Sequence, residues 1–406
     1  MPDQLYDVVI IGGGVVGLST ALNALRVFPK LRLLLAEKEA EVARHQSGHN
    51  SGVIHSGIYY KPGSLKAKLC VEGREAMVAF CAEHNVPYEV CGKLIVAVTE
   101  EEKPRLEMLK ERGQANGLTG LRMLDASEAR AIEPNVGGVA WLLVPATGIT
   151  DYKTVCEKYA ELIGGHGGTV NLSTTVTRIA QSNSDLAVET NRGSFLTRFV
   201  INCAGLQSDY VTEMAGQTPE VRIVPFRGEY YDLAPGRENL VKNLIYPVPD
   251  LRFPFLGVHF TRRVRGGVDA GPNAVLAFKR EGYTHSDISL RDTATTFAYP
   301  GFWRMAAKYW QSGAEEFYRS ISKSAFVRAL QRLMPSLQES DLVSDGSGVR
   351  AQALRRDGSL VDDFQFRASE RMLHVWNVPS PAATASLAIG REIVAMAERE
   401  LGLGVN

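Results

Sequence analysis

The sequence predicts an α/β fold in which a Rossmann-like dinucleotide-binding domain carries an inserted, mainly antiparallel-sheet α+β domain. Three observations lead to this prediction. An apolar strand, a glycine-rich turn and a helix open the chain, strands ending in small residues stand in its middle, and a further strand and helix lie near its end. Segments of a different pattern separate these groups, so the second domain must arise by insertion.

The first element is an apolar strand over residues 6–11, which leads into the turn Gly12-x-Gly14-x-x-Gly17 and a helix over residues 15–27. Gly12 allows a tight turn, Gly14 lets the backbone approach a phosphate, and Gly17 lets the helix pack closely. The N-terminus of the helix offers backbone N–H groups and a positive dipole end to a pyrophosphate. The pattern predicts a dinucleotide site, against the alternative of a glycine-rich turn without a ligand.

A second apolar strand, residues 32–36, ends in Glu37, about twenty residues after Gly17. A carboxylate at this distance accepts hydrogen bonds from a ribose diol and would repel a 2′-phosphate. The ligand is therefore expected to carry a free adenosine ribose.

The remaining elements follow from hydrophobic spacing and turn residues. Helices are predicted over residues 65–84, 100–116, 292–333 and 385–401. A further helix is predicted to begin at an N-cap, Thr150 or Asp151, and to end at the glycines of residues 164–168. Strands are predicted over residues 90–98, 169–172, 175–179, 186–190, 194–201 and 372–378, with a strand-rich region over 221–278. These elements divide into a cofactor-binding domain of residues 1–86, 147–220 and 340–406 and a substrate domain of residues 87–146 and 221–339.

Composition narrows the function classes. The 406 residues contain 45 basic and 45 acidic side chains, so no overall field favours nucleic acid, and nucleic-acid binding is not expected. The five cysteines lack C-x-x-C spacing, which argues against a metal site or a disulfide framework. No apolar run is long enough to span a bilayer, and no room is left for a signal peptide. We expect a cytoplasmic protein or the processed form of a mitochondrial one.

The second informative segment is the loop over residues 44–60, RHQSGHNSGVIHSGIYY. It resembles the flavin loop of the FAD-dependent oxidoreductases related to D-amino-acid oxidase and, more narrowly, of the L-2-hydroxyglutarate dehydrogenase (or oxidase) family. Further strings agree with the narrower family, at residues 62–70, 271–277, 348–352 and 380–384. The resemblance runs over nearly the whole chain. One departure concerns the wider superfamily, which usually has glycine where this chain has Ala382.

The resemblance implies that FAD is the cofactor and that three segments hold it. Ser47, Ser51 and Gly52 of the loop would bind the cofactor, and the backbone at its glycines, Gly48, Gly52 and Gly57, could lie along the isoalloxazine ring. Ala204 and Gly205, at the end of a strand, would form a second contact. A third group, which precedes the last helix and would face the N1–C2=O edge of the ring, consists of Pro381, Ala382 and Thr384. From the residues alone, a tight turn at 202–205 and an ordinary helix entry capped by Thr384 stay open as alternatives.

The family's reaction would be oxidation of L-2-hydroxyglutarate, a small dicarboxylate, to 2-oxoglutarate. It needs a base for the hydroxyl proton and cations for two carboxylates. His55 is the first candidate for the base, although a structural histidine or a covalent flavin anchor would show the same pattern, and His259 is the second. Arg350 is the candidate clamp for one carboxylate, with a structural ion pair as the alternative. Tyr60 and Lys66 are candidates for the far carboxylate.

Residues 299–310 mix aromatic and basic side chains, as does a helix that lies in a membrane surface near a quinone. A buried amphipathic helix would carry the same stripe. With a membrane helix the acceptor is a quinone at the cytoplasmic face of the inner membrane; otherwise oxygen or a soluble carrier serves. The alternative functions are an amine, amino-acid or glycerol-3-phosphate oxidising flavoenzyme, a non-catalytic flavin protein and a nicotinamide-dependent enzyme.

Overall fold

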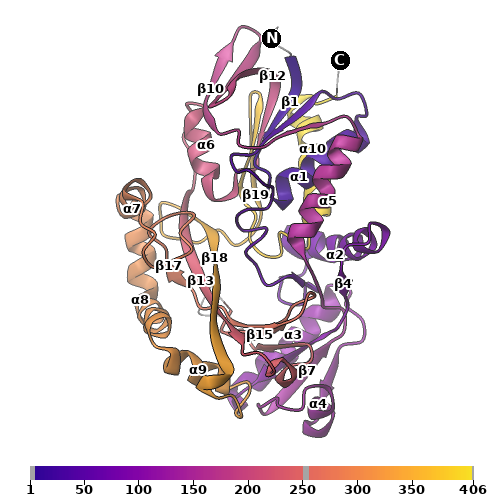
Figure 1. The fold of residues 1–406 in the computed structure, drawn as a ribbon, viewed down its shortest axis with the longest axis vertical. Helices are drawn as coiled ribbons and strands as arrows, with labels where there is room; N and C mark the ends of the chain where they lie inside the picture. The colour runs from indigo at the N-terminus through magenta and orange to yellow at the C-terminus, as the bar shows by residue number, and fades with distance from the viewer. Residues whose placement is uncertain (1–4, 250–255, 405–406) are drawn as a thin grey trace.

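The computed structural model of the chain describes residues 5–249 and 256–404, which build two large sheets, one above the other in Figure 1. The upper part holds the eight-stranded sheet, and both ends of the described chain lie there. The lower part holds most of the nine-stranded sheet.

The centre of the eight-stranded sheet is β1 (Leu5–Ile11), which pairs in parallel with β12 (Gly193–Asn202) on one side and β2 (Leu33–Ala36) on the other. Their apolar side chains are buried on both faces, as expected where helices cover a parallel sheet. The helices α1 (Val15–Val27), α5 (Tyr152–Gly165) and α10 (Ser386–Leu401) share one core with this sheet. The remaining strands of this sheet are β9 (Thr169–Asn171), β10 (Val176–Ser182), β11 (Asp185–Thr190), β19 (Gln365–Ser369) and β20 (Met372–Asn377).

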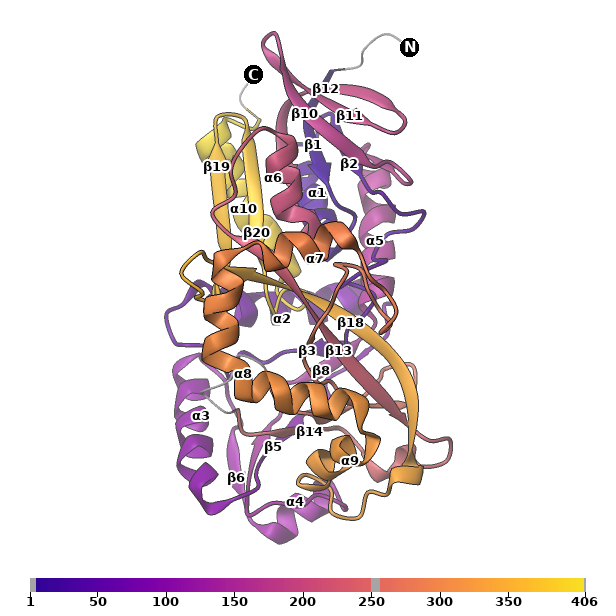
Figure 2. The same ribbon diagram turned by 90° about the vertical axis from the view of Figure 1, so that its left-hand side faces the viewer.

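Two long antiparallel strands of the nine-stranded sheet, β13 (Arg222–Leu233) and β18 (Leu342–Leu354), extend along the molecule from the upper part into the lower one (Figures 1 and 2). The other strands of the nine-stranded sheet are β5 (Lys93–Ala97), β6 (Arg122–Leu124), β7 (Ala140–Val144), β14 (Leu244–Pro247), β15 (His259–Arg262), β16 (Val268–Gly271) and β17 (Val275–Leu276). Most of its neighbouring strands are antiparallel, and only β5 and β14 pair in parallel.

A small sheet joins the segments between the two large ones. It consists of β3 (Val53–Ile54), β8 (Gly148–Thr150) and β4 (Tyr88–Glu89). Because β3 belongs to the loop over residues 44–60, this sheet fixes the middle of that loop between the two halves of the molecule.

The sequence predicted most elements, and the structure refines their bounds. Asp151, rather than Thr150, is the N-cap of α5. The helical region predicted over 292–333 is three helices, α7 (Leu290–Phe297), α8 (Pro300–Ile321) and α9 (Lys323–Gln331). The other helices are α2 (Leu65–Glu83), α3 (Lys103–Ala115), α4 (Ala126–Ile132) and α6 (Ser208–Met214). Among the described residues, no helix is both long and apolar enough to cross a membrane.

Candidate active site

The glycine turn after β1 leaves no room for side chains. A Cβ atom at Gly12, whose φ is +111°, would lie 2.5 Å from the carbonyl oxygen of Cys203, and one at Gly17 would collide with the carbonyl oxygen of Gly12. Gly14 is the N-cap of α1 and offers no side chain to its first turn. The backbone at the start of α1 can therefore meet a pyrophosphate directly, as the sequence pattern predicted.

Glu37 lies directly after β2 and beside this turn. Its carboxylate accepts hydrogen bonds from the backbone N–H groups of Gly13, at 2.5 Å, and Glu39, at 2.8 Å. Only 8% of the residue is exposed. The acid is thus held where a ribose bound over the glycine turn would reach it.

The loop over residues 44–60 packs against this nucleotide turn. Ser47 Oγ accepts a hydrogen bond of 2.9 Å from the backbone N–H of Val15 at the start of α1. A Cβ atom at Gly205 would approach the Gln46 side chain, whose Oε1 accepts a hydrogen bond from Ala351 at 3.0 Å. The loop therefore touches both the helix N-terminus and the segment that follows β12, where Ala204 and Gly205 lie.

Thr384 joins the loop to the entry of α10. Its buried hydroxyl accepts a 3.0 Å hydrogen bond from the backbone N–H of His55 and donates to the carbonyl of Val53 at 3.2 Å. Tyr152 OH lies 3.0 Å from the Thr384 hydroxyl and donates to the same Val53 carbonyl. On this segment, the Pro381 carbonyl accepts a bond from Ala385. The segments that the resemblance assigned to the flavin are thus side by side.

His55 lines the space between these segments. Its Nε2 lies 3.3 Å from the hydroxyl of Ser380. The residue is partly exposed, yet protein surrounds the imidazole. Burial lowers the pKa of His55 to about 3, with a smaller contribution from Lys93. The imidazole is therefore neutral at pH 7 and can accept a proton.

His259 lies on β15 with its ring against Tyr246, at 3.9 Å between ring centroids. Its Nδ1 lies 2.8 Å from the Gly257 carbonyl, and since a carbonyl only accepts, Nδ1 carries the proton and Nε2 keeps its lone pair. Burial lowers the pKa of His259 to about 3, and the nearby charges of Arg350 and Lys93 lower it further. His259 therefore has the protonation state of a base.

Arg350 lies on β18, close enough to His259 for its charge to lower the pKa of that imidazole. Burial raises the pKa of Tyr230, while Arg350 opposes that rise through its charge and a hydrogen bond to the phenol. Tyr60 hydrogen-bonds to Ser380, beside His55. Lys66 already has acceptors, because its ammonium donates to the carbonyl and the carboxylate of Asp362 at 2.8 and 3.1 Å.

Sequence reasoning missed Lys93 at the start of β5. Only 1% of the residue is exposed, and its Nζ lies over the rings of Tyr59 and Tyr246, at 4.4 and 4.7 Å from their centroids. Burial lowers the pKa of Lys93 to about 7. The apolar run LIVAV after Lys93 indicated a buried strand, but nothing local distinguished this lysine from a solvated one.

A cavity of about 210 Å³ opens beside the loop. Its lining combines two parts of the loop, the start of α5 and the turn after β15, namely Ser47, Gly48, Asn50, Ser51, Gly52, Thr150, Asp151, Tyr152, Lys153, Arg263, Val264 and Arg265. Ser51 also hydrogen-bonds to Tyr246. The arginines of that turn are ion-paired, Arg263 with Asp232 at 2.6 Å and Arg265 with Asp151 at 2.5 Å.

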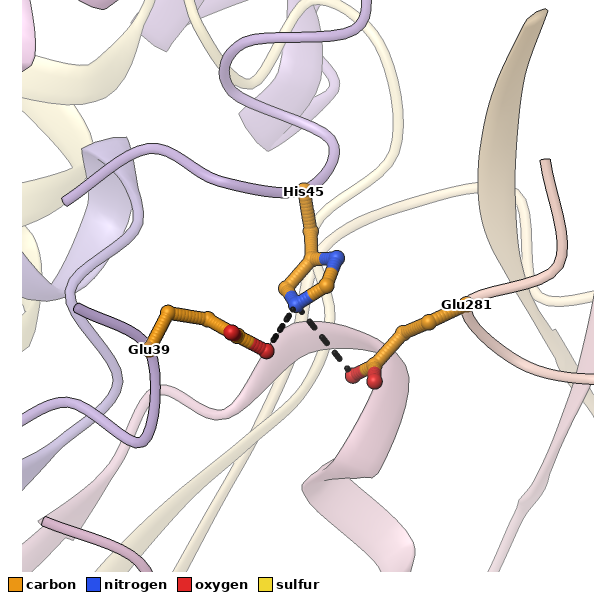
Figure 3. A group of neighbouring side chains, drawn as sticks. All are labelled: Glu39, His45 and Glu281. Atoms are coloured by element: carbon orange, nitrogen blue, oxygen red, sulfur yellow. Dashed lines mark hydrogen bonds and ion pairs between the residues drawn. The ribbon is translucent and has the colours of Figure 1, made fainter. Parts of the chain in front are cut away.

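A charged cluster connects the segment after β2 to the region before α7 (Figure 3). His45 Nε2 lies 2.9 Å from Glu39 and 3.6 Å from Glu281, and its Nδ1 lies 2.9 Å from Tyr283 OH. The Lys38 ammonium donates to both carboxylates, so the two acids share its single positive charge. The cluster holds distant parts of the chain together next to the nucleotide turn.

Comparison with known proteins agrees with this geometry. Residues 7–396 match the family described as FAD dependent oxidoreductase (DAO). The chain belongs to this family. Its fold is shared with L-α-glycerophosphate oxidase from Mycoplasma pneumoniae with FAD bound, at a TM-score of 0.79 and 25% identity over 97% of this chain and 94% of that one. Glycine oxidase from Geobacillus kaustophilus shares it at a TM-score of 0.72 and 19% identity, over 98% and 95%.

Curated relatives are more similar in sequence. An L-2-hydroxyglutarate dehydrogenase of Indibacter alkaliphilus is 54% identical over 95% of this chain and 97% of its own length. The enzyme of that name in Escherichia coli is 44% identical over 96% and 92%. A mitochondrial relative of the same name in Mus musculus is 46% identical over 97% and 88%.

The residues of this family member fit its cofactor, FAD. Added Cβ atoms would fill the glycine turn, and the helix N-terminus, Glu37 and the loop over residues 44–60 meet at one place. Ala382, where the wider superfamily usually has glycine, lies between Pro381 and the buried Thr384, and its N–H donates to the carbonyl of Pro379.

Proposed function

We propose that the protein oxidises L-2-hydroxyglutarate to 2-oxoglutarate, with FAD as the electron acceptor. Relatives with that name, at 44–54% identity over almost the whole chain, carry the proposal. The site supports it because neutral histidines, an arginine and a buried lysine lie close to one another, and one of the histidines is on the loop assigned to the cofactor. Oxidation of a hydroxy diacid needs this combination of base and cations.

Bound FAD supplies the acceptor for the hydride that leaves C2 of the substrate. The hydroxyl proton must go to a base at the same time, and His55 and His259 are both neutral at pH 7. His55 lies on the loop next to Thr384 and Ser380, whereas His259 presents a free Nε2. We propose that one of these two imidazoles takes the proton, with His55 the first candidate because its loop borders the cofactor.

Arg350 would bind the carboxylate next to the reacting carbon, because a guanidinium holds a carboxylate through two parallel hydrogen bonds. That contact fixes the orientation of C2, so that hydride and proton leave in defined directions. Tyr60 and Lys66 border the same region on the side of Ser380 and Asp362.

The decisive experiment mixes anaerobic holoenzyme with L-2-hydroxyglutarate and records the visible spectrum. We expect the yellow flavin to bleach within seconds, with one 2-oxoglutarate formed per flavin reduced. A flavin that stays oxidised contradicts the proposal. Bleaching by glycine, sarcosine or glycerol 3-phosphate would assign the protein to the amine-oxidising or glycerophosphate-oxidising branch.

For the return of electrons we propose a membrane quinone, reached through peripheral membrane contact. The support is the outer face of α7 and α8, which lies on the surface of the molecule (Figure 2). Phe302 and Met305 of α8 are buried, so one side of the helix packs inward. Large apolar side chains are exposed on or beside these helices, namely Ile288, Leu290, Trp303, Trp310, Phe317, Tyr318 and Ile321.

Liposome flotation tests this contact. We expect the protein to float with vesicles of bacterial phospholipid and the double variant W303E/W310E to remain in the pellet. Val27→Glu, an equally exposed apolar position on α1, is the matched control and should float like the wild type. Equal flotation of both variants would exclude α8 as the contact.

A further inference from the structure

Lys93 is a buried amine without an acceptor. Its Nζ has no hydrogen-bond partner within residues 5–249 and 256–404. Burial of an unpaired ammonium is costly, and the fall of its pKa to about 7 reflects that cost. Such a group requires either a structural reason or an anion that arrives from outside.

Other enclosed cations of the chain have carboxylate partners. Arg280, the largest fully buried side chain, is paired with Asp209. Arg227 is paired with Glu229 at 2.8 Å. Buried cations in this molecule are thus usually paired with a carboxylate. Lys93, at the candidate active site, has no such partner among the described residues.

A second orphan donor lies against the first. Tyr59 places its ring 4.4 Å from Lys93 Nζ, and its buried hydroxyl also lacks a partner among the described residues. Burial holds the pKa of Tyr59 well above its usual value, so the phenol stays protonated. Its O–H group is therefore available to donate a hydrogen bond to an acceptor. An ammonium and a phenol that both lack an acceptor match the two oxygens of a carboxylate.

The position of Lys93 and Tyr59 relative to His259 and Arg350 indicates how a bound diacid would lie in the site. The Tyr246 ring contacts both Lys93 and His259, with its centroid 4.7 Å from Nζ and 3.9 Å from the centroid of the imidazole ring. The charges of Arg350 and Lys93 both act on His259. The histidine thus lies within reach of two cations that come from different strands, β18 and β5.

We propose that Lys93, with Tyr59, binds the substrate carboxylate remote from the reacting carbon and makes the enzyme selective for dicarboxylates, while Arg350 binds the near one. This inference rests on the proposed function for the identity of the diacid. It assigns the far carboxylate to Lys93 rather than to Lys66, because the Lys66 ammonium already donates to Asp362. The aromatic faces of Tyr59 and Tyr246 hold the amine in place until the carboxylate arrives.

The test compares two substrates of equal chain length, L-2-hydroxyglutarate and L-2-hydroxypentanoate, which lacks the far carboxylate. Anaerobic stopped-flow reduction of holoenzyme gives a rate and an apparent Kd for each. In Lys93→Met we expect a loss of about 10²- to 10³-fold in the ratio of rate to Kd for the diacid and a much smaller loss for the monoacid. Lys93→Arg should recover part of the diacid preference.

Three outcomes overturn the inference. Equal losses for both substrates in Lys93→Met indicate a structural role, and an unchanged preference removes Lys93 from the site. Loss of preference in Lys66→Met instead of Lys93→Met assigns the far carboxylate to Lys66. Tyr59→Phe, which deletes only the hydroxyl, keeps the test valid if Lys93→Met does not fold, and it should weaken the diacid preference.

A binding measurement separates this inference from the proposed reaction. Glutarate and pentanoate, which have no hydroxyl group to oxidise, are titrated into oxidised holoenzyme while the flavin spectrum is followed. Tighter binding of glutarate that disappears in Lys93→Met supports the diacid site even if neither hydroxy acid reduces the flavin. Equal binding of the two acids to the wild type excludes the site.

Discussion

Removal of the Thr384 hydroxyl should loosen the loop that carries His55. The substitution Thr384→Val keeps the size of the side chain and deletes the oxygen that accepts from His55 N–H and donates to the Val53 carbonyl. Tyr152 still donates to that carbonyl at 3.0 Å, so the carbonyl remains satisfied. The His55 N–H loses the acceptor that the structure gives it.

The expected loss of stability of the loop follows from the hydrogen bonds that the substitution removes. A lost hydrogen bond that leaves a buried N–H without an acceptor costs about 1–3 kcal/mol. That cost corresponds to about 5- to 150-fold more frequent opening of the loop. Since this loop contacts the N-terminus of α1 through Ser47, FAD binding should weaken as well.

Hydrogen exchange over residues 53–57 measures the opening directly. We expect protection to fall by the stated factor in Thr384→Val and to be largely retained in Thr384→Ser. Thr212→Val is a control of similar chemistry, because buried Thr212 accepts from Trp376 at 2.9 Å on the other side of the sheet. It should leave exchange of the loop unchanged. If hydrogen exchange in Thr384→Val equals that of the wild type, the hydrogen bonds of Thr384 do not hold the loop that carries His55.

Two further predictions concern the site. Gly348→Ala should impair flavin binding and stability, because the added Cβ would collide with the His49 carbonyl. Gly346→Ala is the control and should have no such effect, because the space around Gly346 is open; the flavin content of the two purified variants tests this prediction. The pKa of His259 falls from 6.5 to about 3 on folding, so the unfolded chain binds the proton first and the unfolding free energy decreases as pH drops from 6.5 towards 3. In urea titrations of apoprotein, His259→Gln should remove about 2 kcal/mol of the decrease between pH 6.5 and 5; an identical pH profile would mean that His259 does not titrate in this way.

Much of the fold could be predicted because its signals are local. The strand, glycine turn and helix of residues 6–27 depend on backbone room and apolar period, and both are visible in a short stretch of sequence. The bounds of α1 match the prediction, and α10 begins at Ser386, one residue later than predicted. The pairing of strands that are far apart in the chain could not be predicted from the sequence. Nothing near residues 342–354 indicated that they form β18 and pair with β13 along the whole length of both strands. The predicted domain boundaries and the roles of the site residues stay predictions.

The sequence by itself was enough to predict a dinucleotide site at the N-terminal turn, because glycines and an acid at fixed spacing act through the backbone next to them. The loop over residues 44–60 was assigned to the cofactor by its resemblance to a known family. Only the tertiary structure decided which charged groups are enclosed together. Lys93 precedes an ordinary apolar strand in the sequence, and it becomes a buried amine only because Tyr59 and Tyr246, from distant segments, close over it. Desolvation depends on every neighbour in space, so the chemistry of such a group cannot be deduced from the residues beside it in the chain.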